Sequence, residues 1–159
     1  MTTPHSILIR AATAADQRTI TAMVRAERLN PLHLDWPRFI VAEARGQVVG
    51  IGQIKVLGDG TRELASLVTA PTHQGLGIGS ALVHTLQSIA TSPLYLRCAT
   101  HNVTFYERFG FVDLAPGAMP PDLRRAFLLV QRAVRVVRWV KPGQETMHVM
   151  GWWGDGVMG

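Results

Sequence analysis

A glycine-rich stretch, Gln-Gly-Leu-Gly-Ile-Gly at 74–79, constrains the fold of this chain more than any other feature. Residues 63–69 before it have the apolar character of a strand, and residues 80–90 after it place their apolar side chains on one helical face. A glycine turn lets the backbone approach a ligand closely, and the first N–H groups of a helix have no partner inside it. Because the helix dipole adds a partial positive charge there, the stretch predicts a site for the pyrophosphate of a nucleotide-like cofactor.

Two common nucleotide-binding motifs do not fit these glycines. Their positions, 75, 77 and 79, lack the Gly-x-Gly-x-x-Gly spacing of a dinucleotide fold. No Gly-Lys-Ser/Thr follows them, so the stretch is not a Walker A loop.

Composition and charge narrow the class of protein. The chain has 159 residues, 47% of them hydrophobic and 17% charged, as expected of one globular domain. No apolar run is long enough to span a bilayer and the N-terminus does not resemble a secretory signal, so we expect a cytoplasmic protein without a membrane partner. The formal net charge of +5 suits anionic ligands. The single cysteine, Cys98, is expected to be a buried strand residue rather than a nucleophile, and we expect no metal.

The hydrophobic pattern predicts alternating strands and helices. A first helix begins after Thr13, with Asp16 completing a weaker form of the capping box, and ends at Asn30–Pro31, because the residue before proline avoids the helical region. Turns at Gly46 and at Gly58–Gly60 join three strands as a meander. The expected strands are 7–11, 39–44, 48–57, 62–69, 94–98, 111–113 and 146–150, and the later expected helices are 80–90, 102–109 and 122–137.

This order of elements, together with two sequence blocks, resembles the GNAT acetyltransferase superfamily. The first block, His-Gln-Gly-Leu-Gly-Ile-Gly-Ser-Ala-Leu at 73–82, is similar to the family's signature loop of Gln or Arg, two residues, Gly, one residue, then Gly or Ala. The second block, Asn-Val-Thr-Phe-Tyr-Glu-Arg-Phe-Gly-Phe at 102–111, looks like the family's segment of Asn, then Phe-Tyr, then Gly-Phe. The two blocks stand in the family's order and at about its spacing.

The resemblance implies an α/β fold of the α+β type, in which helices flank a mixed, mostly antiparallel central sheet that splays between its two central strands. It predicts a single domain over 1–159, with a core at about 7–113, a C-terminal helix at about 122–137 and a closing strand at about 146–150.

The ligand implied by the resemblance is acetyl-CoA, bound as a cosubstrate. Backbone N–H groups from 74 to 80 would hold its pyrophosphate, and a backbone N–H near Val68 would meet the oxyanion. Gln74 stands where the family often has arginine, so one charged contact with phosphate is missing. The residues expected to contact the cosubstrate are Leu67, Val68, Thr69, Gln74, Gly75, Leu76, Gly77, Ile78, Gly79, Ser80, Asn102, Phe105 and Tyr106.

Catalysis is expected to use a general acid and a general base. Tyr106 matches the family's tyrosine that protonates the leaving thiolate, and a phenol of ordinary pKa about 10 is protonated at neutral pH. Glu63 is the expected base on the central strand, although Ala65 and Ser66 occupy the positions nearer the loop. The alternatives are His73 or His101 at the loop ends, a water chain, or no dedicated base.

The acceptor site is expected in the loop after the first helix, at Asn30, His33, Asp35 and Trp36, followed by Arg38. Its apolar wall, carboxylate and guanidinium suit a small amine such as an amino acid. The alternative is a capping loop with Trp36 tucked into the core. The resemblance thus implies acetyl transfer to a primary amine of a small molecule by direct attack in a ternary complex. A non-catalytic acyl-CoA-binding protein and a protein N-acetyltransferase are the alternative functions.

The helix expected at 122–137 has a basic face and an apolar face. The basic face carries Arg124, Arg125, Arg132, Arg135 and Arg138, and the apolar face carries Phe127, Val130, Ala133, Val134 and Val137. The arginines are interpreted first as a solvated face, then as a patch for an acidic protein or nucleic acid, and last as a contact with CoA phosphates. We do not expect nucleic acid as a partner. The apolar face must pack against the sheet or another subunit, so a homodimer is compatible with the sequence.

Overall fold

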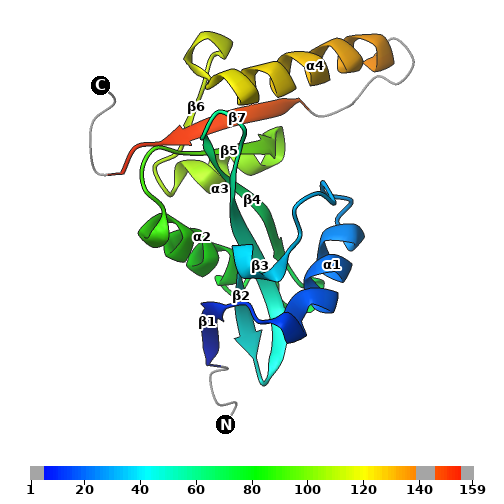
Figure 1. Cartoon of the computed structure of the whole chain (residues 1–159), viewed down its shortest axis with the longest axis vertical. Coiled ribbons are helices and arrows are strands. Elements are labelled where there is room, and N and C mark those ends of the chain that lie inside the picture. The colour runs from blue at the N-terminus through cyan, green and yellow to red at the C-terminus, as the bar shows by residue number, and fades with distance from the viewer. Residues whose placement is uncertain (1–5, 139–145, 155–159) are drawn as a thin grey trace. The chain divides into compact units, whose positions relative to one another are not determined.

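The computed structural model describes residues 6–138 and 146–154, and its contacts divide the chain into two compact units (Figure 1). The first unit consists of 1–55 and 64–90, and the second of 56–63 and 91–159. The first contains β1 (Ile7–Ala11), α1 (Gln17–Ala26), β2 (Phe39–Ala44), nearly all of β3 (Gln47–Val56), most of β4 (Arg62–Thr69) and α2 (Ile78–Ile89). The second contains β5 (Leu94–Ala99), α3 (Val103–Glu107), β6 (Val112–Asp113), α4 (Pro121–Arg138) and β7 (Met147–Trp152).

The described strands, seven in number, form a mixed and mostly antiparallel sheet flanked by helices, which confirms the predicted α/β fold class. In the first unit the strand order is β1-β2-β3-β4, and β2 pairs antiparallel with both β1 and β3. In the second unit the order is β5-β7-β6, and β7 pairs antiparallel with both neighbours. The splay between central strands and the single domain over 1–159 stay predictions.

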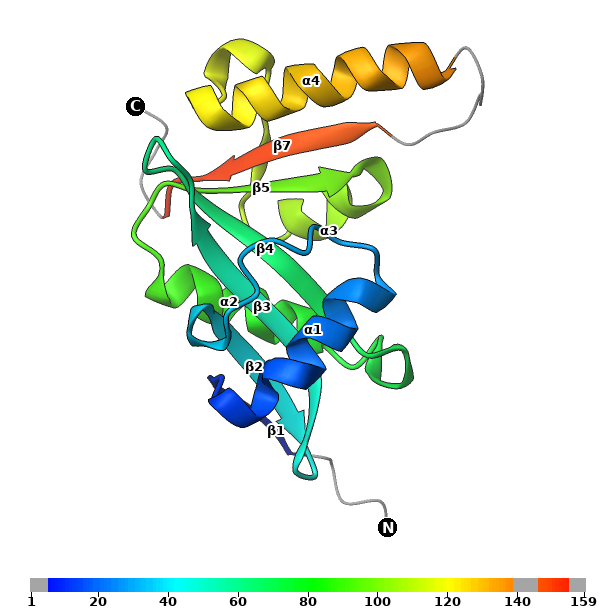
Figure 2. The ribbon, with the colours of Figure 1, turned by 45° about the vertical axis from the view of Figure 1, so that its right-hand side comes forward.

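Two glycines let α2 lie close against β3. A Cβ atom on Gly50 would stand 2.8 Å from Ile78 Cγ2, and one on Gly52 would stand 3.0 Å from Leu86 Cδ1, so a side chain at either position would push a side chain of α2 out of its place. Ile51 between them points to the opposite face, where it packs in a buried cluster with residues of α1. The two helices therefore cover opposite faces of this part of the sheet (Figure 2), and the start of α2 is held against β3.

The predicted end of the first helix is wrong. The sequence predicts that it ends at Asn30–Pro31, but α1 ends at Ala26. Arg28 adopts the left-handed backbone conformation (φ 53°), and the N–H groups of Arg28 and Leu29 donate to carbonyls of the last turn. This pattern is a Schellman motif, which ends a helix whatever follows it.

In the second unit, α4 packs on β7. Leu123 is fully buried in a cluster with Met119 and Val149 of β7. Two reciprocal hydrogen bonds fix the start of the helix, since the N–H of Asp122 donates to Asp59 Oδ2 and the N–H of Asp59 donates to Asp122 Oδ2, each at 3.0 Å. The helix expected at 122–137 is thereby confirmed as α4.

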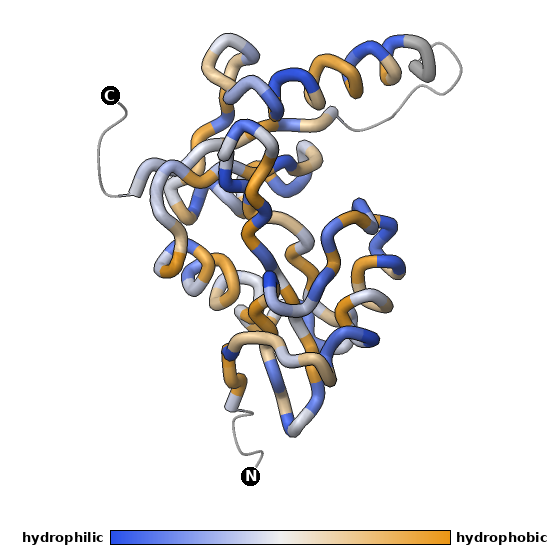
Figure 3. The backbone as a smooth tube through the Cα atoms, viewed as in Figure 1, coloured by the Kyte–Doolittle hydropathy of each residue, from blue (hydrophilic) through white to orange (hydrophobic). Residues whose placement is uncertain are grey.

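Hydrophobic and hydrophilic residues alternate along α4 (Figure 3). The face of the helix that is buried is narrower than the apolar face predicted for it. Phe127 and Val134 are half-buried, whereas Val130 and Ala133 are exposed. The predicted basic residues Arg124, Arg125, Arg132 and Arg135 are exposed, and the side chains of Val137 and Arg138 lie outside the described part. Over 6–138 and 146–154, no helix combines the length and apolar character needed to cross a membrane.

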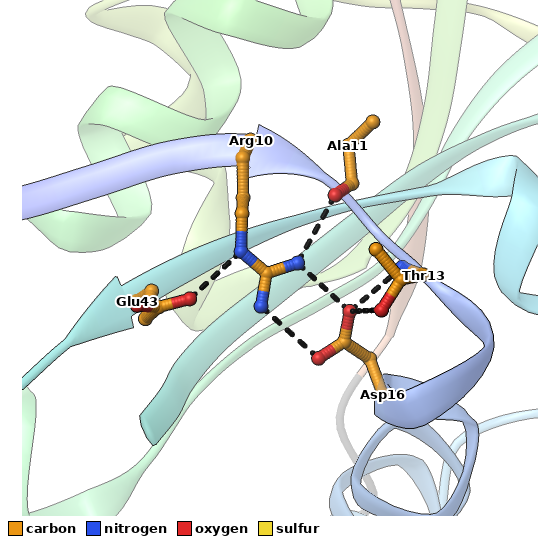
Figure 4. A network of polar contacts seen from close by, with 5 residues as sticks. All are labelled: Arg10, Ala11, Thr13, Asp16 and Glu43. Atoms are coloured by element: carbon orange, nitrogen blue, oxygen red, sulfur yellow. Dashed lines mark hydrogen bonds and ion pairs between the residues drawn. The ribbon is translucent and has the colours of Figure 1, made fainter. Parts of the chain in front are cut away.

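An ion-pair network ties β1 to the start of α1 and to β2 (Figure 4). The Arg10 guanidinium donates to Asp16 Oδ2 at 2.8 Å, to Asp16 Oδ1 at 3.1 Å and to Glu43 Oε2 at 2.8 Å. The N–H of Thr13 also donates to Asp16 Oδ2, at 2.7 Å, which confirms the predicted capping box. Asp16 is buried, and the hydrogen bonds from Arg10 lower its pKa from 3.8 to about 2 despite that burial.

We expect Asp16→Asn to lower the free energy of unfolding at pH 7 by about 1–3 kcal/mol, the usual contribution of hydrogen bonds to charged groups. Because the pKa of Asp16 is lower in the folded state, its contribution is fully present above pH 3.8 and is lost as the pH falls towards about 2. Urea denaturation at several pH values should therefore show the difference from wild type shrinking between pH 4 and pH 2. Asp35→Asn, which changes an exposed carboxylate 3.7 Å from Arg38, is the control and should leave stability unchanged. A deficit independent of pH would contradict this account of Asp16.

Candidate functional site

The glycine loop leads into α2 with its backbone open on one side. Gly75 and Gly77 have left-handed backbones (φ 75° and 79°), and a Cβ atom on either would have no neighbour within 4 Å. Gly77 is the N-cap residue, and no described side chain caps the helix. The first helical bond runs from Ala81 N–H to the Gly77 carbonyl, at 3.0 Å. The N–H groups of the three residues between them, 78–80, therefore have no partner within the helix and form a set of donors that suits an anion.

Gln74 does not extend from this loop as an arginine would. Its Nε2 lies 3.4 Å from the Thr69 carbonyl, so the amide turns back to the end of β4. Beside it, Thr72 Oγ1 and His73 Nδ1 are hydrogen-bonded at 2.9 Å. The positive potential of the loop thus comes from backbone N–H groups and the helix dipole rather than from a guanidinium.

The strand that feeds the loop contains a strained residue. Ser66 has φ 53° inside β4, a conformation that non-glycine residues rarely adopt. Its Oγ accepts a hydrogen bond from Gln53 Nε2 of β3, at 3.0 Å. Gln53 is completely buried, and its Oε1 has no hydrogen-bond partner among the described residues. The next residues, Leu67 and Val68, belong to the segment predicted to contact the cosubstrate.

Side chains from α1 and β3 hold the backbone of the loop that is predicted to bind the acceptor. Gln17 of α1 accepts from Trp36 N–H at 2.9 Å and donates to the Leu34 carbonyl at 2.8 Å. Lys55, buried in β3, donates to the Leu32 carbonyl at 2.9 Å. These three contacts preorganise the loop between 32 and 36 without occupying the side chains that it presents.

The four predicted acceptor residues differ in how available their side chains are. Asn30 Oδ1 accepts from Leu32 N–H at 2.9 Å, so this oxygen stabilises the loop itself. Trp36 is half-buried and packs against the core cluster of the first unit, as the alternative interpretation expected. His33 and Asp35 are exposed, and His33 has a left-handed backbone (φ 60°).

Tyr106, the predicted general acid, lies in α3 of the second unit and is buried between aromatic rings. The rings of Phe105 and Phe111 stand edge-on to it, with centroids 5.0 and 6.0 Å away. Burial, and to a lesser extent the nearby Cys98, raises the pKa of Tyr106 above its ordinary value of 10.0. The phenol therefore stays protonated throughout the neutral and moderately alkaline range. Asn102, at the start of the same helix, is half-buried.

Glu63, the predicted base, is paired with Arg97 inside the second unit. Glu63 Oε1 accepts from Arg97 Nε at 2.5 Å and Oε2 accepts from Arg97 Nη2 at 3.1 Å. The carboxylate is buried, and both of its oxygens are occupied. A base in this position has to accept a proton while it remains bound to a cation. A water chain therefore stays an alternative to Glu63 for removing the proton of the amine.

Cys98 is buried in β5, with its Sγ 3.7 Å from Met150 Sδ. Burial raises the pKa of its thiol to about 11, which suppresses the nucleophilic thiolate at neutral pH. Across the described ranges, no group of three or more His, Cys, Asp or Glu side chains is placed to hold a metal ion.

The predicted site residues fall into two sets, one in each unit. Residues 67–69, 74–80 and the acceptor loop belong to the first unit, whereas Glu63, Asn102, Phe105 and Tyr106 belong to the second. Sequence reasoning missed Gln17, Gln53 and Lys55, which hold these segments in place. A sequence signal for two of them exists in β3, where the polar residues Gln53 and Lys55 flank Ile54 and follow an apolar run.

Comparisons with known proteins agree with the sequence blocks. A family model described as "Acetyltransferase (GNAT) domain" matches residues 35–113, a span that contains both blocks. No curated protein matches the chain.

Solved structures of similar fold include three from different organisms. Rv2747 from Mycobacterium tuberculosis, in complex with CoA and NLQ, superposes with a TM-score of 0.67 at 23% identity, covering 92% of this chain and 98% of that one. N-acetylglutamate synthase from Neisseria gonorrhoeae, complexed with CoA and N-acetyl-glutamate, has a TM-score of 0.70 at 20% identity over 95% of this chain and 36% of that one. Ard1 from Thermoplasma volcanium has a TM-score of 0.63 at 16% identity, covering 92% and 97%. This chain thus spans about a third of the Neisseria synthase and nearly all of the other two.

We expect Gly77→Asp to weaken CoA binding by roughly ten- to hundredfold, because the new carboxylate repels phosphate and takes the helical N–H groups for itself. Gly46→Asp is the matched control, since Gly46 has nearly the same backbone (φ 76°) and equally open surroundings in the β2–β3 turn. Isothermal titration with CoA should show a loss for Gly77→Asp alone. Equal affinities for the two variants would place the CoA site elsewhere.

Proposed function

The chain belongs to the GNAT acetyltransferase superfamily, and we propose on that premise that it transfers an acetyl group from acetyl-CoA to a primary amine of a small molecule. The observation that carries the proposal is the loop at 74–80, where left-handed glycines precede a helix whose first N–H groups are unpaired. Those N–H groups fit a pyrophosphate, and the open space beside Gly75 and Gly77 leaves room for one.

The proposed reaction is direct attack in a ternary complex. Acetyl-CoA supplies an activated acyl carbon; the amine nitrogen forms a bond to it, the carbon–sulfur bond breaks, and the products are an N-acetylated amine and CoA. The chain's task is to hold the two substrates, to stabilise the oxyanion and to move two protons. The backbone N–H near Val68 is the proposed oxyanion donor.

Tyr106 is the proposed general acid for the thiolate. A phenol whose pKa is raised by burial stays protonated at neutral and moderately alkaline pH, where it can give its proton to the thiolate. The proton that the amine loses goes to Glu63 or to a water chain. The ion pair with Arg97 makes Glu63 less suitable as the base, because the guanidinium occupies both carboxylate oxygens.

The proposed acceptor is an amino acid or a similarly small amine. The loop between 32 and 36 is preorganised and exposes Asp35, a partner for an ammonium or amide group. Rv2747 was solved with NLQ and the Neisseria synthase with N-acetyl-glutamate, both in the presence of CoA, which supports this class of acceptor.

The proposal is tested by measuring CoA release from acetyl-CoA with a panel of free amino acids, their amides, polyamines and peptides. Turnover with a small amine supports the proposal, and N-acetylation is then confirmed by mass spectrometry. Turnover with peptides alone would instead assign a protein N-acetyltransferase. No release with any amine, while CoA still raises the melting temperature, would identify a non-catalytic acyl-CoA-binding protein.

Tyr106→Phe should lower kcat by roughly ten- to a thousandfold with little change in the KM for acetyl-CoA, because it removes the acid and keeps the ring. Tyr95→Phe is the control, as it removes the chain's other tyrosine hydroxyl, on a half-buried ring that packs against Trp153. Because the pKa of Tyr106 is raised, wild-type kcat should show no loss up to pH 10 from ionisation of this phenol. Equal kcat in Tyr106→Phe and wild type would remove Tyr106 from the acid role.

A further inference from the structure

Two unfavourable features meet inside the first unit. Ser66 has a left-handed backbone (φ 53°) in the middle of β4, and Gln53 of β3 is completely buried with an unpaired amide oxygen. A single hydrogen bond of 3.0 Å, from Gln53 Nε2 to Ser66 Oγ, joins them. Each feature costs free energy of folding, and such features are found mostly at functional sites, so the contact between them calls for a functional explanation.

The strain at Ser66 is specific to its residue type. Glycine adopts this backbone without cost, whereas serine has a Cβ that crowds the adjacent backbone. Serine therefore needs an external contact to hold it there, and the hydrogen bond from Gln53 is the one that its side chain makes.

The burial of Gln53 is also specific. Its neighbour Ile51 packs in the apolar cluster of the α1 face, and a leucine at position 53 would fill the same interior without an unpaired oxygen. The amide is therefore poorly explained by packing and well explained by its contact with Ser66.

We propose that Gln53 is a positioning residue, which holds Ser66 in the left-handed conformation so that the N–H groups of Leu67 and Val68 are aimed at the acyl group. A left-handed residue rotates the adjacent peptide groups out of the regular strand pattern. One of their N–H groups then no longer points towards the neighbouring strand and can bond a ligand. This inference rests on the proposed acetyl transfer, in which a backbone N–H near Val68 stabilises the oxyanion.

The first test is kinetic and uses Gln53→Leu, Ser66→Gly and the double variant. Gln53→Leu should lower kcat by roughly ten- to hundredfold, as expected for a misplaced oxyanion donor, with the KM for acetyl-CoA changed less than about threefold. Adding Ser66→Gly should restore most of the lost kcat, because glycine adopts the required backbone without the hydrogen bond. Failure of the glycine to restore kcat would overturn the proposal, since neither core disruption nor a lost substrate contact is repaired at position 66.

The control for this rescue is Arg28→Gly. Arg28 has the same backbone angle (φ 53°) in the same unit but lies at the end of α1. In the Gln53→Leu background this substitution should leave kcat low, although it removes the strain of a left-handed arginine. Recovery of kcat with Arg28→Gly would show a general gain of stability and would contradict a specific role for Ser66.

The second test does not depend on activity. In the wild-type background, Ser66→Gly should lower the melting temperature by roughly 2–8 °C, because it leaves the buried Gln53 amide without its partner. In the Gln53→Leu background the same substitution should raise the melting temperature or leave it unchanged. The same sign in both backgrounds would mean that Gln53 does not hold Ser66.

The two tests separate failure of the inference from failure of the proposed function. If wild type acetylates no amine, the proposed function is wrong, and the melting temperatures still decide whether Gln53 fixes the Ser66 backbone. If wild type is active and the rescue fails, the acetyl transfer stands and the positioning role is wrong.

Discussion

The N–H groups at the start of α2 bond neither a capping side chain nor a carbonyl of the helix. Two features of the first unit account for this: the residue at the N-cap and the packing of the helix on the sheet. The N-cap residue is Gly77, which has no side chain that could fold back onto them. Gly50 and Gly52 let the helix pack directly on β3, and this packing sets the position of its N-terminus. An anion is the natural acceptor for such a fixed set of donors, so the packing of one helix defines the chemistry of the loop before it.

The polar side chains of β3 position two other segments of the first unit. On the face towards α2 the strand carries glycines, whereas on the opposite face it passes from Ile51 to Gln53 and then Lys55. Gln53 and Lys55 donate to Ser66, in the strained part of β4, and to the Leu32 carbonyl, in the loop predicted to bind the acceptor. One strand therefore supports the helix on one side and positions two predicted substrate-binding segments on the other. Polar groups at buried sites cost stability, and here the donors Gln53 Nε2 and Lys55 Nζ each hold a segment whose position matters for the proposed reaction.

Much of this architecture is predictable from sequence, because periodicity and turn residues report local structure. The meander, the helix after the glycines, the capping box and α4 all follow from such signals. The early end of α1 does not, since it depends on Arg28 adopting a backbone for which arginine carries no preference. The anchors Gln17, Gln53 and Lys55 were also missed, because their partners lie far along the chain and a single sequence does not show which distant backbone groups need a donor. The ion pair of Glu63 is not predictable for the same reason. Its partner Arg97 lies far along the chain, in β5, and nothing in the sequence shows that the two side chains meet.

The proposed function depends on the binding of the CoA pyrophosphate by backbone amides between 74 and 80. It is tested most directly by following the backbone amide resonances of ¹⁵N-labelled protein during titration with CoA and, separately, with pantetheine, which lacks the pyrophosphate. We expect CoA to shift the amide resonances of Gly75, Gly77 and Gly79 strongly and pantetheine to leave them nearly unchanged. If CoA binds while these three amide resonances do not shift, the pyrophosphate is not held by this loop.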